Sequence, residues 1–134
     1  MSMTRIASAL CGLLLASSAF AAPHFADIYA TDSDSGDATD SFGTSAPKIY
    51  VHASMVDIPN GSKMTGTWIA VDTNGVAPAN YKIDSSDLTA GTIVNTVNFS
   101  MTKPNAGWPA GKYRVDLLID GKPAGAANFT IEKD

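Results

Sequence analysis

The chain has 134 residues, a formal net charge of −4 and a single cysteine. Its Lys and Arg residues are scattered singly, unlike the clustered basic side chains that meet nucleic-acid phosphates, so we expect no nucleic-acid partner. The sequence contains no phosphate-binding glycine loop and no set of nucleophile, base and orienting residue in a usable order. We therefore expect neither enzyme activity nor a cofactor.

Residues 1–21 have the features of a secretory signal peptide. Arg5 precedes an apolar run that ends in small residues, and cleavage is expected after Ala21. The run is too short to cross a membrane comfortably, and no later stretch has the roughly twenty apolar residues of a membrane helix. Cleavage would also remove Cys11, leaving a mature chain without thiol or disulfide. The sequence thus predicts a periplasmic or secreted protein with no membrane insertion after cleavage.

Residues 22–46 are expected to form a flexible acidic segment. Beyond Thr31 the composition is dominated by Asp, Ser, Thr, Gly and Ala, and Phe42 is the one large apolar residue. So little apolar surface cannot offset the entropy lost on ordering. Residues 25–29 carry enough apolar side chains for a short strand. The boundary of the folded domain is expected at residue 47.

Residues 47–134 alternate between apolar and polar side chains, a pattern typical of strands that bury one face. Gly, Pro and Asn turns separate the expected strands, and Asp120–Gly121 marks a closing hairpin. The expected strands are 49–55, 64–72, 81–83, 93–101, 113–119 and 127–131. Apolar residues at helical spacing are confined to the signal peptide. We therefore expect one all-β antiparallel sandwich of about six to seven strands.

This pattern resembles the immunoglobulin-like β-sandwiches of bacterial exported proteins. The resemblance rests on Trp108, Pro109, Gly111, Tyr113, Val115, Asp120, Gly121, Phe129 and Ile131. In that family a tyrosine near the start of the penultimate strand forms the tyrosine corner, and Tyr113 stands at its place. Trp68 would be the core tryptophan. The chain departs from antibody-type domains, because Val115 stands where they have their second cysteine.

The predicted function is that of a non-catalytic binding module. It would recognise a protein or surface component in the cell envelope or outside the cell, because sandwich scaffolds place function on loops and strand edges. Trp108 lies in a Gly-Trp-Pro turn and is the candidate partner-binding residue, since an exposed aromatic would act as an anchor. Packing across the end of the sandwich is the alternative for Trp108. Residues 74–80 form a second candidate loop, and the oligomeric state stays open.

The alternative function is periplasmic metal handling, first of copper. Imidazole and thioether ligands suit copper and are offered by His52, Met55, Met64 and Met101. The methionines fit the apolar faces of strands as well. The closing hairpin is similar to that of CopC-type periplasmic copper carriers, although Lys122 occupies the position of the histidine that carries metal chemistry in that family.

Calcium is the second metal considered. Carboxylates in the acidic segment come from Asp32, Asp34, Asp37 and Asp40. Their spacing departs from that of an EF-hand loop, because Gly36 stands where the third oxygen ligand belongs and Gly43 where the closing glutamate belongs. A solvated acidic segment is the alternative, so no metal site is predicted.

Overall fold

The structure is a computed structural model that describes residues 22–33, 36–92 and 94–134, so the predicted signal peptide lies outside the described residues. Eight strands form within these ranges. They are β1 (His24–Thr31), β2 (Ser41–Gly43), β3 (Lys48–Val56), β4 (Lys63–Asp72), β5 (Tyr81–Thr89), β6 (Thr96–Thr102), β7 (Gly111–Ile119) and β8 (Lys122–Glu132). In the described part of the chain, no helix is long and apolar enough to span a membrane.

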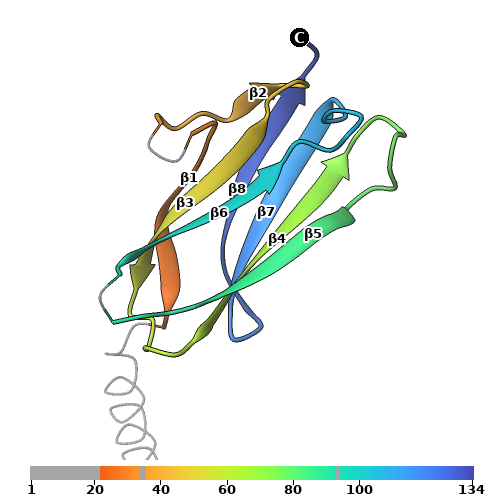
Figure 1. Cartoon of the computed structure of the whole chain (residues 1–134). Helices are drawn as coiled ribbons and strands as arrows, with labels where there is room; N and C mark the ends of the chain where they lie inside the picture. The colour runs from red at the N-terminus through yellow and green to blue at the C-terminus, as the bar shows by residue number, and fades with distance from the viewer. Residues whose placement is uncertain (1–21, 34–35, 93) are drawn as a thin grey trace, which may run out of the picture.

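The strands form two sheets, packed as a sandwich (Figure 1). One sheet has three strands in the order β1-β3-β6, and the other has five in the order β2-β8-β7-β4-β5. Strand β2 runs parallel to β8, and the other pairs are antiparallel. The predicted all-β, immunoglobulin-like sandwich is confirmed, with eight described strands instead of six or seven.

The folded domain begins before the expected boundary at residue 47. Strand β1 pairs with β3 over most of its length, and β2 pairs with the C-terminal part of β8. Phe25 and Phe42 enter the core with only 5% and 7% of their surfaces exposed. Segment 22–46 has few apolar residues, so its composition does not predict these strands. They are stabilised by pairing with β3 and β8 and by burial of the Phe25 and Phe42 rings. Segment 22–46 is therefore not a separate unit preceding the sandwich.

The closing hairpin joins β7 to β8 as predicted. Ile119 pairs with Lys122, so the connection is the two-residue turn Asp120–Gly121. Both turn residues have positive φ angles, 50° and 81°, which is the backbone geometry of a type I′ turn. Asp120 also accepts a hydrogen bond from the Lys63 N–H through Oδ1, at 2.9 Å, which ties the turn to the start of β4.

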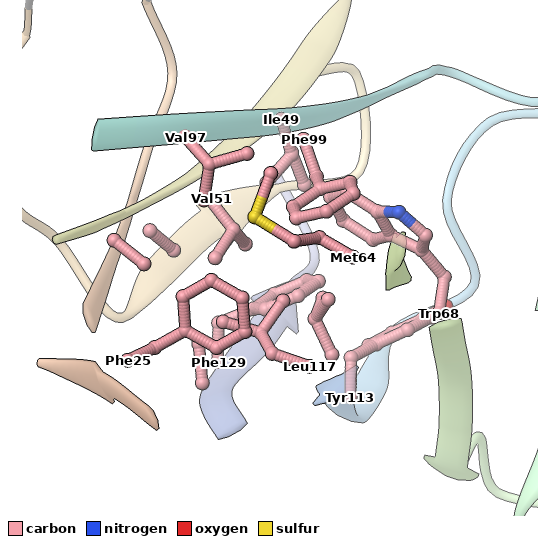
Figure 2. Close-up of a cluster of buried hydrophobic side chains, with 14 of the residues drawn as sticks. Phe25, Ile49, Val51, Met64, Trp68, Val97, Phe99, Tyr113, Leu117 and Phe129 are labelled. Carbon is pink, nitrogen blue, oxygen red and sulfur yellow. The ribbon is translucent and has the colours of Figure 1, made fainter. Parts of the chain in front are cut away.

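The core lies between the sheets and is centred on aromatic side chains (Figure 2). Trp68 is 2% exposed and confirms the prediction of a core tryptophan. It pairs in register with Val115, which is fully buried and fills the place of the antibody-type cysteine with an aliphatic side chain. Phe129 contacts Trp68 edge-on at 6.1 Å between ring centroids and stacks on Tyr113 at 5.3 Å. Burial of apolar surface holds the sheets together.

Tyr113 forms the predicted tyrosine corner. It lies near the start of β7, and its hydroxyl donates a 2.5 Å hydrogen bond to the carbonyl oxygen of Pro109, four residues upstream. The ring is 2% exposed. Because the phenolate form would lose its hydration, burial raises the pKa of Tyr113 to about 12.

This raised pKa predicts a loss of stability in strong base. The unfolded chain releases the Tyr113 proton near its ordinary pKa of 10.0, whereas the folded protein holds it until about 12, so the free energy of unfolding falls across that interval. We expect Tyr113→Phe to cost about 1 to 3 kcal/mol at neutral pH and to show a shallower decline in base. Denaturant titrations at neutral and basic pH measure both. Tyr81→Phe, at an exposed ring, is the control, and the same alkaline decline in Tyr113→Phe as in the wild type would contradict the assignment.

Candidate binding surface

The residues predicted for copper do not converge. Alternate residues of β3 enter the core, so His52 points to the outer face of its sheet, where its ring stacks on Tyr29 with centroids 5.2 Å apart. Met64 is buried in the core, and Met55 and Met101 pack partly buried against the same core. The sheet separates the imidazole from the thioethers. The prediction that these four residues form a copper site is therefore wrong. Odd- and even-numbered residues of a strand point to opposite faces of the sheet, so His52 cannot join the methionines.

The acidic segment does not assemble a metal site from its described residues. Asp34 lies outside them, and Asp32, Asp37 and Asp40 are exposed. Within residues 22–33, 36–92 and 94–134, no three His, Cys, Asp or Glu side chains come close enough to hold a metal ion. Asp40 instead uses its main-chain carbonyl, which accepts the Thr130 N–H at 2.8 Å and fixes the chain before β2.

Trp108 is buried, so it is not the exposed anchor that the turn sequence suggested. Its side chain is 2% exposed, and its indole Nε1–H donates to the Ala46 carbonyl at 2.8 Å. Its main-chain N–H donates to the Thr44 carbonyl at 3.0 Å, and its ring meets Tyr113 edge-on. The alternative, packing across the end of the sandwich, is correct. Trp108 fastens the loop after β2, which sequence patterns could not place beside it.

The second candidate loop, between β4 and β5, is exposed and internally braced. The hydroxyl of buried Thr73 accepts the Ala77 N–H at 2.9 Å, and the Asp72 carboxylate accepts the Asn74 N–H at 3.0 Å. The Asn80 N–H closes the loop on the Val71 carbonyl at 3.0 Å. These bonds order the loop before any partner arrives, which lowers the entropy cost of binding.

Exposed apolar side chains gather around one strand. In the described part of the chain, four large apolar side chains are exposed, namely Val76 (70%), Tyr81 (51%), Leu88 (42%) and Val94 (57%). All four lie on β5 or on the connections that join it to β4 and β6. We call β5 together with these four residues the β5 surface. The four side chains are spread along the length of β5 and onto the connection at each of its ends, so they outline an elongated candidate interaction surface (Figure 1).

Sheet topology explains why the β5 surface is open. Strand β6 lies over β4, since a methyl group added at Gly66 would come 2.7 Å from the Phe99 ring. Strand β5 lies one position beyond β4, at the border of its sheet (Figure 1). The five-stranded sheet therefore extends past the three-stranded one, and no described strand covers β5. Eight of its nine residues are exposed.

Strand β5 is also longer than its sequence predicts. The sequence predicts a strand over 81–83, whereas β5 continues through Thr89 and pairs with β4 along nearly all of that length. Side-chain bonds across the outer face support the pairing, from the Thr65 hydroxyl to Asp87 at 2.7 Å and between Thr67 and Ser85 at 3.2 Å. An apolar alternation is missing because, of the residues of β5, only Ile83 is partly buried, where it packs against the core.

Comparisons with known proteins agree with this fold. No protein-family model matches the sequence, and no curated protein is significantly similar to it. Among solved structures, an immunoglobulin-like protein from Pseudomonas aeruginosa is similar with a TM-score of 0.52 and 10% sequence identity, covering 84% of this chain and 94% of that one. The alkylpurine DNA glycosylase AlkC of Pseudomonas fluorescens, bound to DNA with an abasic-site analogue, is similar with a TM-score of 0.50 and 14% identity, covering 82% of this chain and 30% of that one.

The protein therefore has an immunoglobulin-like β-sandwich fold. At sequence identities of 10% and 14%, these similarities show the fold and give no information about the chemistry of the protein. A fold of this kind is a scaffold on which edges and loops bind other molecules.

Proposed function

We propose that the protein is a non-catalytic, exported binding module that recognises a macromolecule in the cell envelope or outside the cell through the β5 surface. The observation that carries the proposal is that the four exposed large apolar side chains among the described residues, Val76, Tyr81, Leu88 and Val94, all lie along β5 and its two connections. The signal-like sequence of residues 1–21 supports export.

The chemistry of the β5 surface suits recognition of a polypeptide. Tyr81 offers a large amphipathic ring of the kind enriched at protein interfaces. Asp84 lies on the same side of β5 as Tyr81 and Leu88 and adds negative charge beside them. The strand also carries the exposed Lys82, and Asp87 bonds to Thr65 on the outer face. The one ion pair among the described residues, between Arg114 and Asp116, involves none of these groups. Apolar anchors flanked by charges that stay in solvent give both affinity and orientation to an encounter.

Position-dependent photocrosslinking tests the proposal. Benzoylphenylalanine is placed at Val76, at Leu88 and, as a matched control, at Asn128, which is exposed on β8 away from β5. Mature protein is then irradiated with cell envelopes of the source organism. We expect the same product from Val76 and Leu88, its loss when excess unlabelled protein competes, and no such product from Asn128.

A variant sharpens the same test. Tyr81→Ser combined with Leu88→Ser removes two exposed apolar groups without opening the core, so the fold should persist while the Val76 product falls about tenfold. Equal products at all three positions, or undiminished capture by the double variant, would contradict the proposed surface.

A further inference from the structure

Strand β6 has a free edge whose main-chain groups can be assigned. It pairs with β3 on one side and with no described strand on the other. The ladder to β3 is bracketed by two bonds of 2.9 Å, from the Met55 N–H to the Asn95 carbonyl and from the Lys103 N–H to the Pro47 carbonyl. Odd-numbered residues of β6 therefore bond to β3, because main-chain groups on a strand alternate in direction. The N–H and C=O groups that face outward belong to Thr96, Asn98, Ser100 and Thr102.

This edge lacks the features that keep other edges from pairing. Strand β1 has a register shift and a positive φ at Asp27, β2 has three residues, and β5 carries charges and a register shift. Strand β6 holds an unbroken register of seven pairs with β3 and contains no charged residue, proline or glycine. Charges, bulges and short length are what natural sheets use to block added strands.

The side of β5 that faces the sandwich lies beside this edge. Residues of β5 that pair with the inward-facing residues of β4 point the same way, which places Tyr81, Asp84, Ser86 and Leu88 on that side. A strand added to β6 would continue the three-stranded sheet over β5. It would cover the half-exposed Tyr81 and Leu88 and satisfy the outward main-chain groups of β6.

A second copy of the chain does not fit at this position. Each copy carries its own β4 beneath its β6, and strands within a sheet lie about 4.8 Å apart. If β6 paired with its equivalent in another molecule, the β4 of that molecule would occupy the place where β5 already lies. The edge accepts a strand that has no sheet beneath it, which is an extended peptide segment.

We infer that the free edge of β6 binds an extended segment of the partner polypeptide as a fourth strand of the three-stranded sheet. The inference rests on the proposed function and names the form in which the partner binds. Apolar side chains of the segment alternate toward Tyr81 and Leu88, and a Lys or Arg near its middle faces Asp84, whose carboxylate otherwise accepts the Ser85 N–H at 2.8 Å. The uncharged edge and the Asp84 carboxylate on the facing side of β5 favour an amphipathic strand with one basic residue near its middle.

A linear-peptide phage library and amide hydrogen exchange test this inference. The library is selected on the mature protein, and the enriched peptides are expected to alternate apolar and polar residues and to contain Lys or Arg. In the free protein the amides of Val97, Phe99 and Met101 should exchange slowly and those of Asn98 and Ser100 rapidly. Saturating peptide should slow the Asn98 and Ser100 amides at least tenfold, because they become hydrogen-bonded.

Proline and alanine at the same positions separate main-chain from side-chain contributions. Asn98→Pro and Ser100→Pro each remove an outward N–H that makes no bond to β3, whereas Asn98→Ala and Ser100→Ala keep it. We expect each proline to weaken peptide binding about tenfold and each alanine less than threefold, with circular dichroism confirming the fold of every variant. Amide hydrogen exchange of the wild-type protein with bound peptide tests the same inference without any substitution.

The outcomes separate this inference from the proposed function. If bound peptide slowed amide exchange only in loop 73–80 and not in β6, strand addition would be overturned. The proposal of a binding module that uses the β5 surface would still stand. Failure to select any peptide, together with specific crosslinking of a folded protein through Val76, would do the same. Loss of position-dependent crosslinking would overturn the proposed function itself.

Discussion

Replacing Trp108 by alanine is expected to lower the free energy of unfolding by about 3 to 5 kcal/mol. The indole is 2% exposed, and its Nε1–H fastens the loop after β2 by donating to the carbonyl of Ala46. The main-chain bond from Trp108 to Thr44 would remain in the variant. The substitution would leave a cavity beside Tyr113 and orphan the Ala46 carbonyl. Chemical denaturation followed by the fluorescence of the remaining Trp68 measures the loss.

The matched control is Val76→Ala, which shortens a side chain that is 70% exposed and should change stability by less than about 0.5 kcal/mol. Partner binding should depend on Val76 and not on Trp108. Val76→Ala should weaken partner capture, whereas folded Trp108→Phe should leave it intact. A stable Trp108→Ala protein that had lost its partner would restore the anchor hypothesis and contradict the buried position.

Gly111→Ala is expected to destabilise the protein by about 3 kcal/mol or more. Gly111 begins β7 with a φ of 152°, and an added Cβ would come 2.1 Å from the carbonyl oxygen of Asp72 and 2.8 Å from the Cα of Thr73. The clash is with main chain, so a side-chain rotation cannot relieve it. The start of β7 would have to move away from the end of β4, which would disturb the tyrosine corner.

Gly121→Ala is the control for this prediction, because Gly121 also has a positive φ, 81°, but nothing lies within 4 Å of an added Cβ. It should cost about 1 kcal/mol, the backbone contribution alone. Thermal and denaturant unfolding of both variants gives the comparison. Equal losses at Gly111 and Gly121 would mean that the close approach of β7 to Asp72 is absent in solution.

Strands with one buried face were predictable from the sequence. The alternation around Val51, Trp68 and Val115 identifies β3, β4 and β7, and the turn Asp120–Gly121 identifies the last hairpin. These features are local, since period-two patterning and turn chemistry operate over a few residues.

Strands β1, β2 and β5 were harder to predict for different physical reasons. Strands β1 and β2 lie in a polar segment and are held by pairing with distant strands and by Phe25 and Phe42. Strand β5 buries only Ile83, and that only in part, so its sequence lacks the alternation of apolar and polar residues typical of a half-buried strand. Long-range pairing overrides composition in all three.

The candidate surface was only partly predictable. The sequence predicts residues 74–80 as a candidate binding loop, but it indicates Trp108, and not the apolar residues around β5, as the partner-binding residue. The sequence does indicate that Val76 is exposed. It is an apolar residue between Gly75 and Pro78, in a turn too short for its side chain to reach the core. Alternation along β3 alone predicts that His52 and Met55 point to opposite faces of the sheet. The positions of Met64 on β4 and Met101 on β6 relative to His52 can be known only from the folded structure.

The most direct measurement of the central claim is hydroxyl-radical footprinting of the mature protein, alone and with the partner captured through Val76. Val76, Tyr81, Leu88 and Val94 should all lose reactivity on binding, while Tyr29 and Tyr50 on the outer face of the three-stranded sheet keep theirs. Protection of Tyr29 and Tyr50 with the β5 surface still reactive would contradict the account.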